Sequence, residues 1–241
     1  MAKFYKCELK AFTRFLPPKI VTNYDLSTKM DTSDAWISER TGIKERRFAD
    51  PEASTSDLAI HAVQELMTKH SYKATDFDYI IAGTLSPDFY YPGIAPMIQH
   101  KLGIPFVPAL DIRVQCSAFV YAVKMADAMI RSGQYKKILL VFSDVQSKFL
   151  DLSTAGRNAS VLLSDGAAAL VCESVECKEN ELPSGKNQTS GVIDSILGSD
   201  GSGAELLQLP SPGSASKDFL SQEILDNGLW HPKMEGKLVF K

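Results

Sequence analysis

Residues 111–133, DIRVQCSAFVYAVKMADAMIRSG, constrain the fold more than any other stretch of the chain. The segment just before Cys116, residues 108–114, is short and apolar and lies among prolines, which is typical of a β-strand. Apolar side chains then recur at helical spacing up to Gly133, a natural helix end; they are Phe119, Val120, Val123, Ala126, Met129 and Ile130. The pattern predicts a strand followed at once by a helix, with Cys116 in the turn between them.

Cys116 stands where a nucleophile would be favoured. The first turn of a helix offers free backbone N–H groups and the positive end of the helix dipole, and both stabilise a thiolate. A plainer interpretation stays open from position alone, namely a free cysteine that is buried and packs as a small hydrophobic residue.

Composition indicates an ordinary globular protein. The 241 residues suffice for one large core or two small ones, and 44% apolar with 23% charged residues argues against disorder. The net charge of −3, with scattered Lys and Arg, excludes the basic surface that nucleic-acid binding needs. The chain has no apolar run of membrane length and no signal-peptide core in MAKFYKCELK, so we expect a cytoplasmic protein without a membrane partner.

The cysteines do not suggest a metal site. Cys7, Cys116, Cys172 and Cys177 form neither a CxxC pair nor a Cys/His ligand spacing. We therefore expect no bound metal and reduced thiols.

Strand and helix patterns alternate along the chain. Strand patterns occupy residues 4–21, 79–83, 137–143, 160–173 and 191–198. Helices are predicted after the capping residues 54–57, over 94–102 and after Cys116. The cluster KERR at 44–47 is expected to be a solvated loop, or else to meet an anion, and 174–190 a polar surface loop. The alternation predicts an α/β fold with a mostly parallel sheet.

Several motifs, in one order along the chain, resemble the β-ketoacyl-acyl carrier protein synthase III family of thiolase-fold condensing enzymes. They are VTNYDL…DTSDAWISERTGIKERR, GTLSPDFYYPGIAPMIQHKLGI, DIRVQCSAFVYA, LLVFSDV…GRNASVLLSDGAAA, LGSDGSGAELLQLP and HPKMEGKLVFK. The resemblance implies an N-terminal thiolase-like half over residues 1–173 that carries the nucleophile. The polar loop 174–190 would follow, and 191–241 would begin an incomplete C-terminal half.

The resemblance also implies roles for single residues. Cys116 corresponds to the nucleophile that takes an acyl group from acyl-CoA. Tyr91 corresponds to an aromatic residue that crosses a homodimer interface and shapes the partner's acyl pocket. The residues that correspond to contacts of the coenzyme are Trp36 and Arg157 around the adenine, Arg40 and Thr41 at the nucleotide end, and Met234, Gly236 and Phe240 along the pantetheine tunnel. Taken singly, Trp36 is also typical of a cap over a core, and Arg40 or Arg157 of a solvated charge.

The sequence departs from the family pattern in three respects. Gln115 and Ala118 replace a small residue before the cysteine and a glycine after it, and Asn158 replaces a glycine after the arginine. The family's catalytic histidine and asparagine correspond to no residue of this sequence; its histidines are His61, His70, His100 and His231, which we expect to be structural or exposed. We expect a part of a longer protein, with a partner polypeptide or a degenerate product as alternatives.

Three functions remain open from the sequence. The leading one is an acyltransferase that starts fatty-acid synthesis, in which acylated Cys116 is attacked by the carbanion from malonyl-acyl carrier protein (malonyl-ACP). The second is acyl transfer from acyl-CoA to an alcohol or amine, and the third is a non-catalytic subunit of a dimer. The resemblance implies acyl-CoA as a substrate and no permanently bound cofactor.

Overall fold

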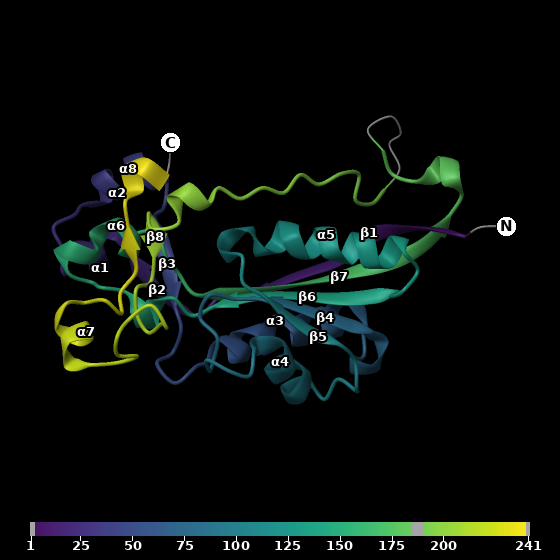
Figure 1. Cartoon of the computed structure of the whole chain (residues 1–241), viewed down its shortest axis with the longest axis horizontal. Helices are drawn as coiled ribbons and strands as arrows, with labels where there is room; N and C mark the ends of the chain where they lie inside the picture. Colours follow the sequence, from purple (N-terminus) through teal and green to yellow (C-terminus); the bar gives the residue numbers. More distant parts are fainter. Residues whose placement is uncertain (1–2, 185–189, 240–241) are drawn as a thin grey trace. The chain divides into compact units, whose positions relative to one another are not determined.

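The computed structural model describes residues 3–184 and 190–239, which form two compact units (Figure 1). The first unit comprises Met1–Leu16, Glu52–Asp144 and Gly166–Leu197, and the second comprises Pro17–Pro51, Val145–Asp165 and Gly198–Lys241. The units are interleaved in the sequence, since each is assembled from three segments of the chain.

The first unit is built on a five-stranded sheet of order β1-β7-β6-β4-β5. The strands are β1 Phe4–Phe15, β4 Tyr79–Gly83, β5 Ala109–Ile112, β6 Lys137–Asp144 and β7 Gly166–Cys177. Strands β6, β4 and β5 are parallel, whereas β7 runs antiparallel to both β6 and β1. The expected α/β fold is confirmed, with β6, β4 and β5 parallel and the antiparallel strand β7 between β6 and the edge strand β1.

Helices cover both faces of this sheet, as continuous apolar strands such as β6 require. The helix α5 (Ala118–Arg131) lies on one face, and α3 (Thr55–His70) and α4 (Ile94–Leu102) lie on the other (Figure 1). Helix α3 starts with a capping box between Ser54 and Asp57, and α4 ends at Gly103 in the left-handed conformation. Both of these helix signals were read correctly from the sequence.

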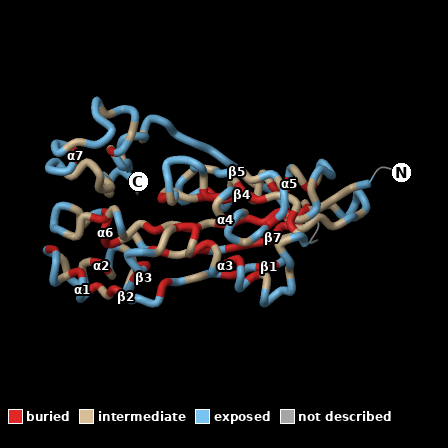
Figure 2. The backbone as a smooth tube through the Cα atoms, turned by 90° about the horizontal axis from the view of Figure 1, so that it is seen from below, coloured by how far each residue is buried: buried red, intermediate tan, exposed pale blue. Residues whose placement is uncertain are grey.

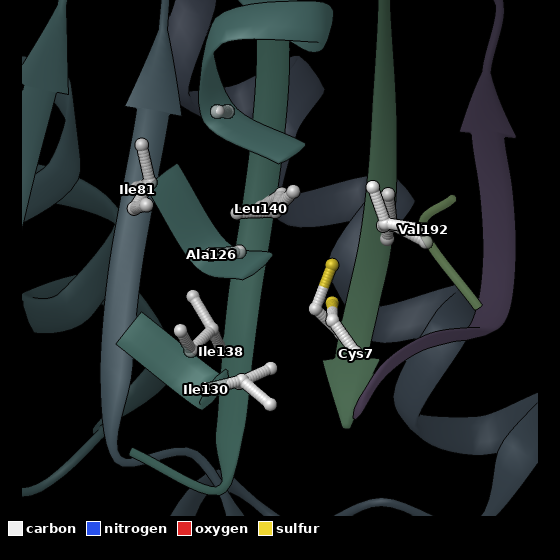
Figure 3. Close-up of a cluster of buried hydrophobic side chains, with 10 residues drawn as sticks. Cys7, Ile81, Ala126, Ile130, Ile138, Leu140 and Val192 are labelled. Atoms are coloured by element: carbon white, nitrogen blue, oxygen red, sulfur yellow. The ribbon is translucent and has the colours of Figure 1, made fainter. Parts of the chain in front are cut away.

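The core between α5 and the sheet depends on small residues of the helix. Ala122, Ala126 and Ile130 lie at a spacing of four and pack on Ile81, Ile138 and Leu140 of the strands (Figure 3). Phe119 and Val120, two of the apolar residues that recur at helical spacing, are exposed. Alanines, and not these larger residues, form the buried face at this end of the helix, and they allow the helix to approach the sheet closely.

The sheets of the second unit are smaller than the sheet of the first unit. Strands β2 (Lys19–Thr22) and β3 (Glu45–Phe48) form one antiparallel pair, and β8 (Leu207–Gln208) and β9 (Lys233–Met234) form another. Its helices are α1 Asn23–Ser27, α2 Asp34–Thr41, α6 Arg157–Ser160, α7 Gln222–Asp226 and α8 Gly236–Val239. Its core comprises Val21, Leu26, Met30, Ile37, Phe48, Leu150 and Val161. Buried positions concentrate around β2, β3 and α1, whereas the α7 segment is largely exposed (Figure 2).

The segment 44–47 is not a solvated loop, because most of it belongs to β3. Arg46 is only 3% exposed. Its guanidinium donates to the carbonyl oxygens of Val21 (3.2 Å) and Val161 (3.0 Å) and to Oδ1 of Asn23 (2.9 Å). These acceptors offset the cost of burying a polar group, which sequence spacing does not reveal.

Two other segments also differ from the prediction. Residues 174–177 continue β7 and pair with β1, so the polar loop begins later than expected. No strand forms over 191–198 among the residues the structure describes; the backbone N–H of Val192 donates to Cys7 (3.0 Å), and the segment makes no ladder. Phe240, which the resemblance places along the pantetheine tunnel, lies outside the described residues.

Asp165 joins the segment after β3 to the turn at Ser147 in the second unit. It is 2% exposed, and its carboxylate accepts hydrogen bonds from the backbone N–H of Ala49 (2.7 Å) and from Ser147 N (2.8 Å) and Oγ (2.5 Å). An amide at this place offers one acceptor oxygen in place of two, and it directs N–H groups at other donors.

We therefore expect Asp165→Asn to lower the free energy of unfolding by about 2 kcal/mol, because a buried donor loses its acceptor. Urea unfolding followed by circular dichroism measures the change. The control is Asp200→Asn, whose exposed carboxylate accepts one hydrogen bond, from Ser202 N at 2.9 Å. Equal midpoints for the Asp165 variant and the control would contradict this account.

Candidate functional site

The structure places Cys116 in the turn between β5 and α5. The strand ends at Ile112, a 3₁₀ helix η2 spans Gln115–Ser117, and α5 begins at Ala118. The Cys116 side chain is exposed, so the alternative of a buried cysteine is wrong. Ser117, the N-cap of α5, makes no side-chain cap hydrogen bond within the described part of the chain. The Ser117 hydroxyl therefore does not occupy the N–H groups at the start of α5; of these, the N–H of Ala118 donates to the Gln115 carbonyl.

Gln115 gives this turn its unusual backbone. Its φ is +50°, a left-handed conformation that costs a residue with a side chain about 1 kcal/mol. Two hydrogen bonds close the turn around it, from Ser117 N to the Val114 carbonyl (3.2 Å) and from Ala118 N to the Gln115 carbonyl. The strained residue directly precedes the cysteine.

The start of α5 rests on the end of β4 at Gly83. A Cβ atom built on Gly83 would lie 2.8 Å from Cβ of Ala118 and 3.0 Å from Cδ1 of Phe142. Phe142, on β6, also meets the ring of Phe119 edge-on, with centroids 5.8 Å apart. The height of Cys116 above the sheet is therefore set by the absence of a side chain at Gly83.

A second group of expected site residues gathers around Trp36 in the second unit. The guanidinium carbons of Arg40 and Arg157 lie 4.4 and 4.7 Å from the centroid of the indole ring. Trp36 and Arg40 lie one turn apart on α2, and Arg157 opens α6. Cations at this distance are attracted by the face of an indole, so the three side chains form one stack.

The polar atoms of this stack are held by local hydrogen bonds. Nη1 of Arg157 donates to the Asp31 carbonyl (2.5 Å), and Nη1 of Arg40 donates to the Trp36 carbonyl (3.2 Å). The Thr41 hydroxyl donates to the Ile37 carbonyl (2.7 Å), so it serves the end of α2. Nε of Arg157 is buried and has no partner among the residues that the structure describes.

These residues border a cavity of about 750 Å³ in the second unit. Of the residues expected to contact the coenzyme, it brings together Trp36, Arg40, Thr41, Met234 and Gly236, with Arg157 stacked on Trp36. Cys116 and Tyr91 belong to the first unit, where Tyr91 is 83% exposed. We refer to the cavity as the Trp36 cavity.

Residues 110–201, which include the Cys116 turn, match the family model described as 3-Oxoacyl-[acyl-carrier-protein (ACP)] synthase III. The β-ketoacyl-acyl-carrier-protein synthase III of Koribacter versatilis is 34% identical over 241 residues, which are 100% of this chain and 68% of that protein. This chain belongs to the synthase III family. The members of this family are acyltransferases of the condensing type, so this chain is an enzyme of that type.

Other synthase III proteins agree. The enzyme of Caldanaerobacter subterraneus is 40% identical over 227 residues, which are 94% of this chain and 64% of that protein. The crystal structure of the Aquifex aeolicus synthase III superimposes with a TM-score of 0.80 at 31% identity, over 97% of this chain and 66% of that one. The chain thus spans about two thirds of the length of its synthase III relatives.

Sequence reasoning missed part of the lining of the Trp36 cavity. The further residues are Ile43, Asn158, Val161, Leu162, Glu235 and Lys237. Asn158 was noted only as a departure from the family pattern, although its position next to Arg157 was a signal. The sequence gives no reason to assign Ile43 or Val161 to a binding site, because both have the apolar character of core residues.

Across residues 3–184 and 190–239, the helices are too short or too polar to span a membrane. In the same ranges, no three His, Cys, Asp or Glu side chains stand together as ligands for a metal ion.

Gly83→Ala tests the contact that positions the start of α5. We expect the added methyl group to lower the free energy of unfolding by about 2 kcal/mol, because Ala118 and Phe142 leave no room for it. The rate of Cys116 alkylation by iodoacetamide should change as well, since the turn must shift. Gly198→Ala is the control, because nothing lies within 4 Å of its added Cβ. Wild-type stability and alkylation in Gly83→Ala would refute the contact.

Proposed function

We propose that the chain carries out the acylation step of a 3-oxoacyl-acyl carrier protein synthase III. The observation that carries the proposal is the exposed thiol of Cys116 at the uncapped start of α5. The thiolate sulfur attacks the carbonyl carbon of an acyl-CoA thioester. The bond between that carbon and the coenzyme sulfur then breaks, and the coenzyme leaves with the electron pair as a thiolate, which takes up from water a proton equivalent to the one that Cys116 released on ionising.

The α5 amides assist the attack. Negative charge develops on the thioester oxygen as the sulfur adds, and preformed N–H donors stabilise such charge without reorganising. A helix of 14 residues also directs the positive end of its dipole at this place. Gly83 and the closed turn around Gln115 keep the thiol and these donors in a fixed relation.

The Trp36 cavity supports acyl-CoA as the donor. An adenine ring stacks well on an indole, and the Arg157 guanidinium is a flat cation suited to the ring's other face. Arg40 and Lys237 add positive charge near the phosphates that accompany an adenine in coenzyme A. Met234 and Gly236 offer an apolar, unhindered wall for the pantetheine arm. Acyl-CoA is a substrate in this proposal, and no permanently bound cofactor is involved.

The complete reaction would add a decarboxylative condensation with malonyl-ACP in a homodimer. The shared name of the relatives supports an acyl-carrier-protein acceptor over an alcohol or an amine. The family's histidine and asparagine, which activate the malonyl group, correspond to no residue of this sequence. The proposal for these 241 residues is therefore the transfer of an acyl group to Cys116.

Intact mass spectrometry after incubation with acetyl-CoA tests the nucleophile. We expect the wild-type chain to gain one acetyl group and Cys116→Ala to gain none, because the other thiols are less accessible. Cys7 and Cys172 are buried, and the Cys7 thiol and burial together raise the pKa of Cys172 far above its usual value. The control is Cys177→Ala, which removes a partly exposed thiol and should keep the adduct. A folded wild-type chain without an adduct would refute the proposal.

Isothermal titration with coenzyme A tests the Trp36 cavity. Trp36→Ala and Arg157→Ala should each weaken binding about tenfold, since each removes one side of the stack around the adenine. Arg14→Ala is the matched control, because Arg14 is an exposed arginine of β1 outside the cavity. Equal affinities for all three variants and the wild type would place the coenzyme elsewhere.

A further inference from the structure

The loop 84–93 joins β4 to α4 and is tied down at both ends by aspartates. At its start, Oδ1 of Asp144 accepts hydrogen bonds from Leu85 N (2.7 Å) and Thr84 Oγ1 (3.0 Å). At its end, Oδ1 of Asp111 accepts from Ile94 N (2.7 Å) and Ala95 N (3.1 Å). Both carboxylates belong to strands of the sheet, so the ends of the loop are fixed to the rigid part of the first unit.

A third aspartate holds the middle of the loop. Oδ1 of Asp88 accepts a hydrogen bond from Ser56 N (2.9 Å), and its Oδ2 accepts one from Ser56 Oγ (2.5 Å). Lys101 of α4 donates in turn to Ser56 Oγ (2.6 Å) and to Oδ1 of Asp57 (2.6 Å). The result is a chain from the Lys101 ammonium through a fully buried hydroxyl to the Asp88 carboxylate.

The capping box of α3 is complete without the hydrogen bonds that link Lys101, Ser56 and Asp88. Ser54 and Asp57 already form a complete capping box, in which Asp57 N donates to Ser54 Oγ and Ser54 N donates to Asp57 Oδ2 at 2.9 Å. Burial opposes ionisation of Asp57, but the hydrogen bonds from Lys101 and Ser54 outweigh it and lower its pKa to about 2. Lys101 is thus anchored by Asp57. Asp88 accepts a further first-turn N–H of α3, that of Ser56, and the same hydrogen bonds fix this part of the loop to the start of α3.

What the loop presents is aromatic. Phe89, Tyr90 and Tyr91 follow Asp88 directly and are 56%, 68% and 83% exposed. Three neighbouring aromatic side chains held out to solvent by a fixed backbone are unusual unless another surface meets them. Asp88 is the last side chain tied to the core before them.

We propose that Asp88, held by Ser56 and Lys101, is a positioning residue that fixes Tyr91 and through it sets the acyl chain length accepted at Cys116. The inference rests on the proposed function and extends it to a homodimer in which, as the family resemblance implies, Tyr91 of one copy closes the acyl pocket of the other. A pocket wall that shifts by the length of one methylene group changes discrimination between acyl chains about tenfold. Fixing the position of Tyr91 therefore selects the length of the acyl group that is accepted.

The test is Asp88→Asn in the full chain. The amide keeps the shape, but its NH₂ group and the Lys101 ammonium then both face the Ser56 oxygen, and the hydroxyl loses its acceptor. The chain is incubated with equal amounts of acetyl-CoA and octanoyl-CoA, and the two adducts are counted by intact mass. We expect the octanoyl-to-acetyl ratio to rise about threefold or more, because a looser Tyr91 admits the longer chain.

Two comparisons separate positioning from general destabilisation. Asp78→Asn removes a similar carboxylate, which accepts from the backbone N–H of Lys136 (2.7 Å) and Lys137 (3.0 Å), and should leave the ratio unchanged. In a Tyr91→Ala background, Asp88→Asn should have no further effect on the ratio, because residues that act through one another are not additive. If Asp88→Asn does not fold, Ser56→Ala removes the hydroxyl link alone and should shift the ratio in the same direction.

A wild-type ratio in folded Asp88→Asn would overturn the proposal. So would an equal rise in the Asp78→Asn control or in the Tyr91→Ala background. These outcomes leave the acylation of Cys116 standing, since each is measured on acylated protein. An absence of any adduct on the wild-type chain would instead refute the proposed function, and this inference with it.

Discussion

The close approach of α5 to the sheet is the contact on which the rest of the first unit depends. Ala118 meets the bare backbone of Gly83, and Ala122 and Ala126 continue the contact along the helix. Small residues along one stripe let the helix lie deep, so dispersion contacts are many and little space is left unfilled. The helix start cannot rise or tilt without losing these contacts, and Cys116 is therefore held at a fixed place by packing rather than by its own bonds.

The loops near this site are held by a different kind of interaction. Asp111 in β5 and Asp144 at the end of β6 each accept two or more hydrogen bonds, and the donors include backbone N–H groups of the loop after β4 or of the helix that follows it. These carboxylates lie toward the carboxyl ends of β5 and β6, the two strands parallel to β4 on either side of it, and ligands bind at such ends in open α/β sheets. Charge-assisted bonds to backbone amides are among the stronger hydrogen bonds in proteins. The fold thus combines an apolar contact below the helix with ionic hydrogen bonds around its start.

The sequence predicted what depends on local spacing and missed what depends on distant partners. The capping box at Ser54, the helix end at Gly103 and the turn at Cys116 are local, and each is where the pattern indicated. Arg46 was assigned to a loop because its acceptors, such as the Val161 carbonyl, lie 115 positions away. The hydrogen bonds that link Asp88 through Ser56 to Lys101 were not predicted, for the same reason. The Trp36 cavity was anticipated only through the resemblance to a family, since no spacing rule joins Trp36 to Arg157.

The strained turn before Cys116 follows from these contacts. A left-handed Gln115 persists only where the surrounding structure determines the backbone more strongly than the residue's own preference. Here β5 fixes one side of the turn, and the contact of Ala118 with Gly83 fixes the other. The two residues by which the turn departs from its family thus differ in kind. Ala118 is part of the packing that sets the thiol's position, whereas Gln115 bears the strain which that position imposes.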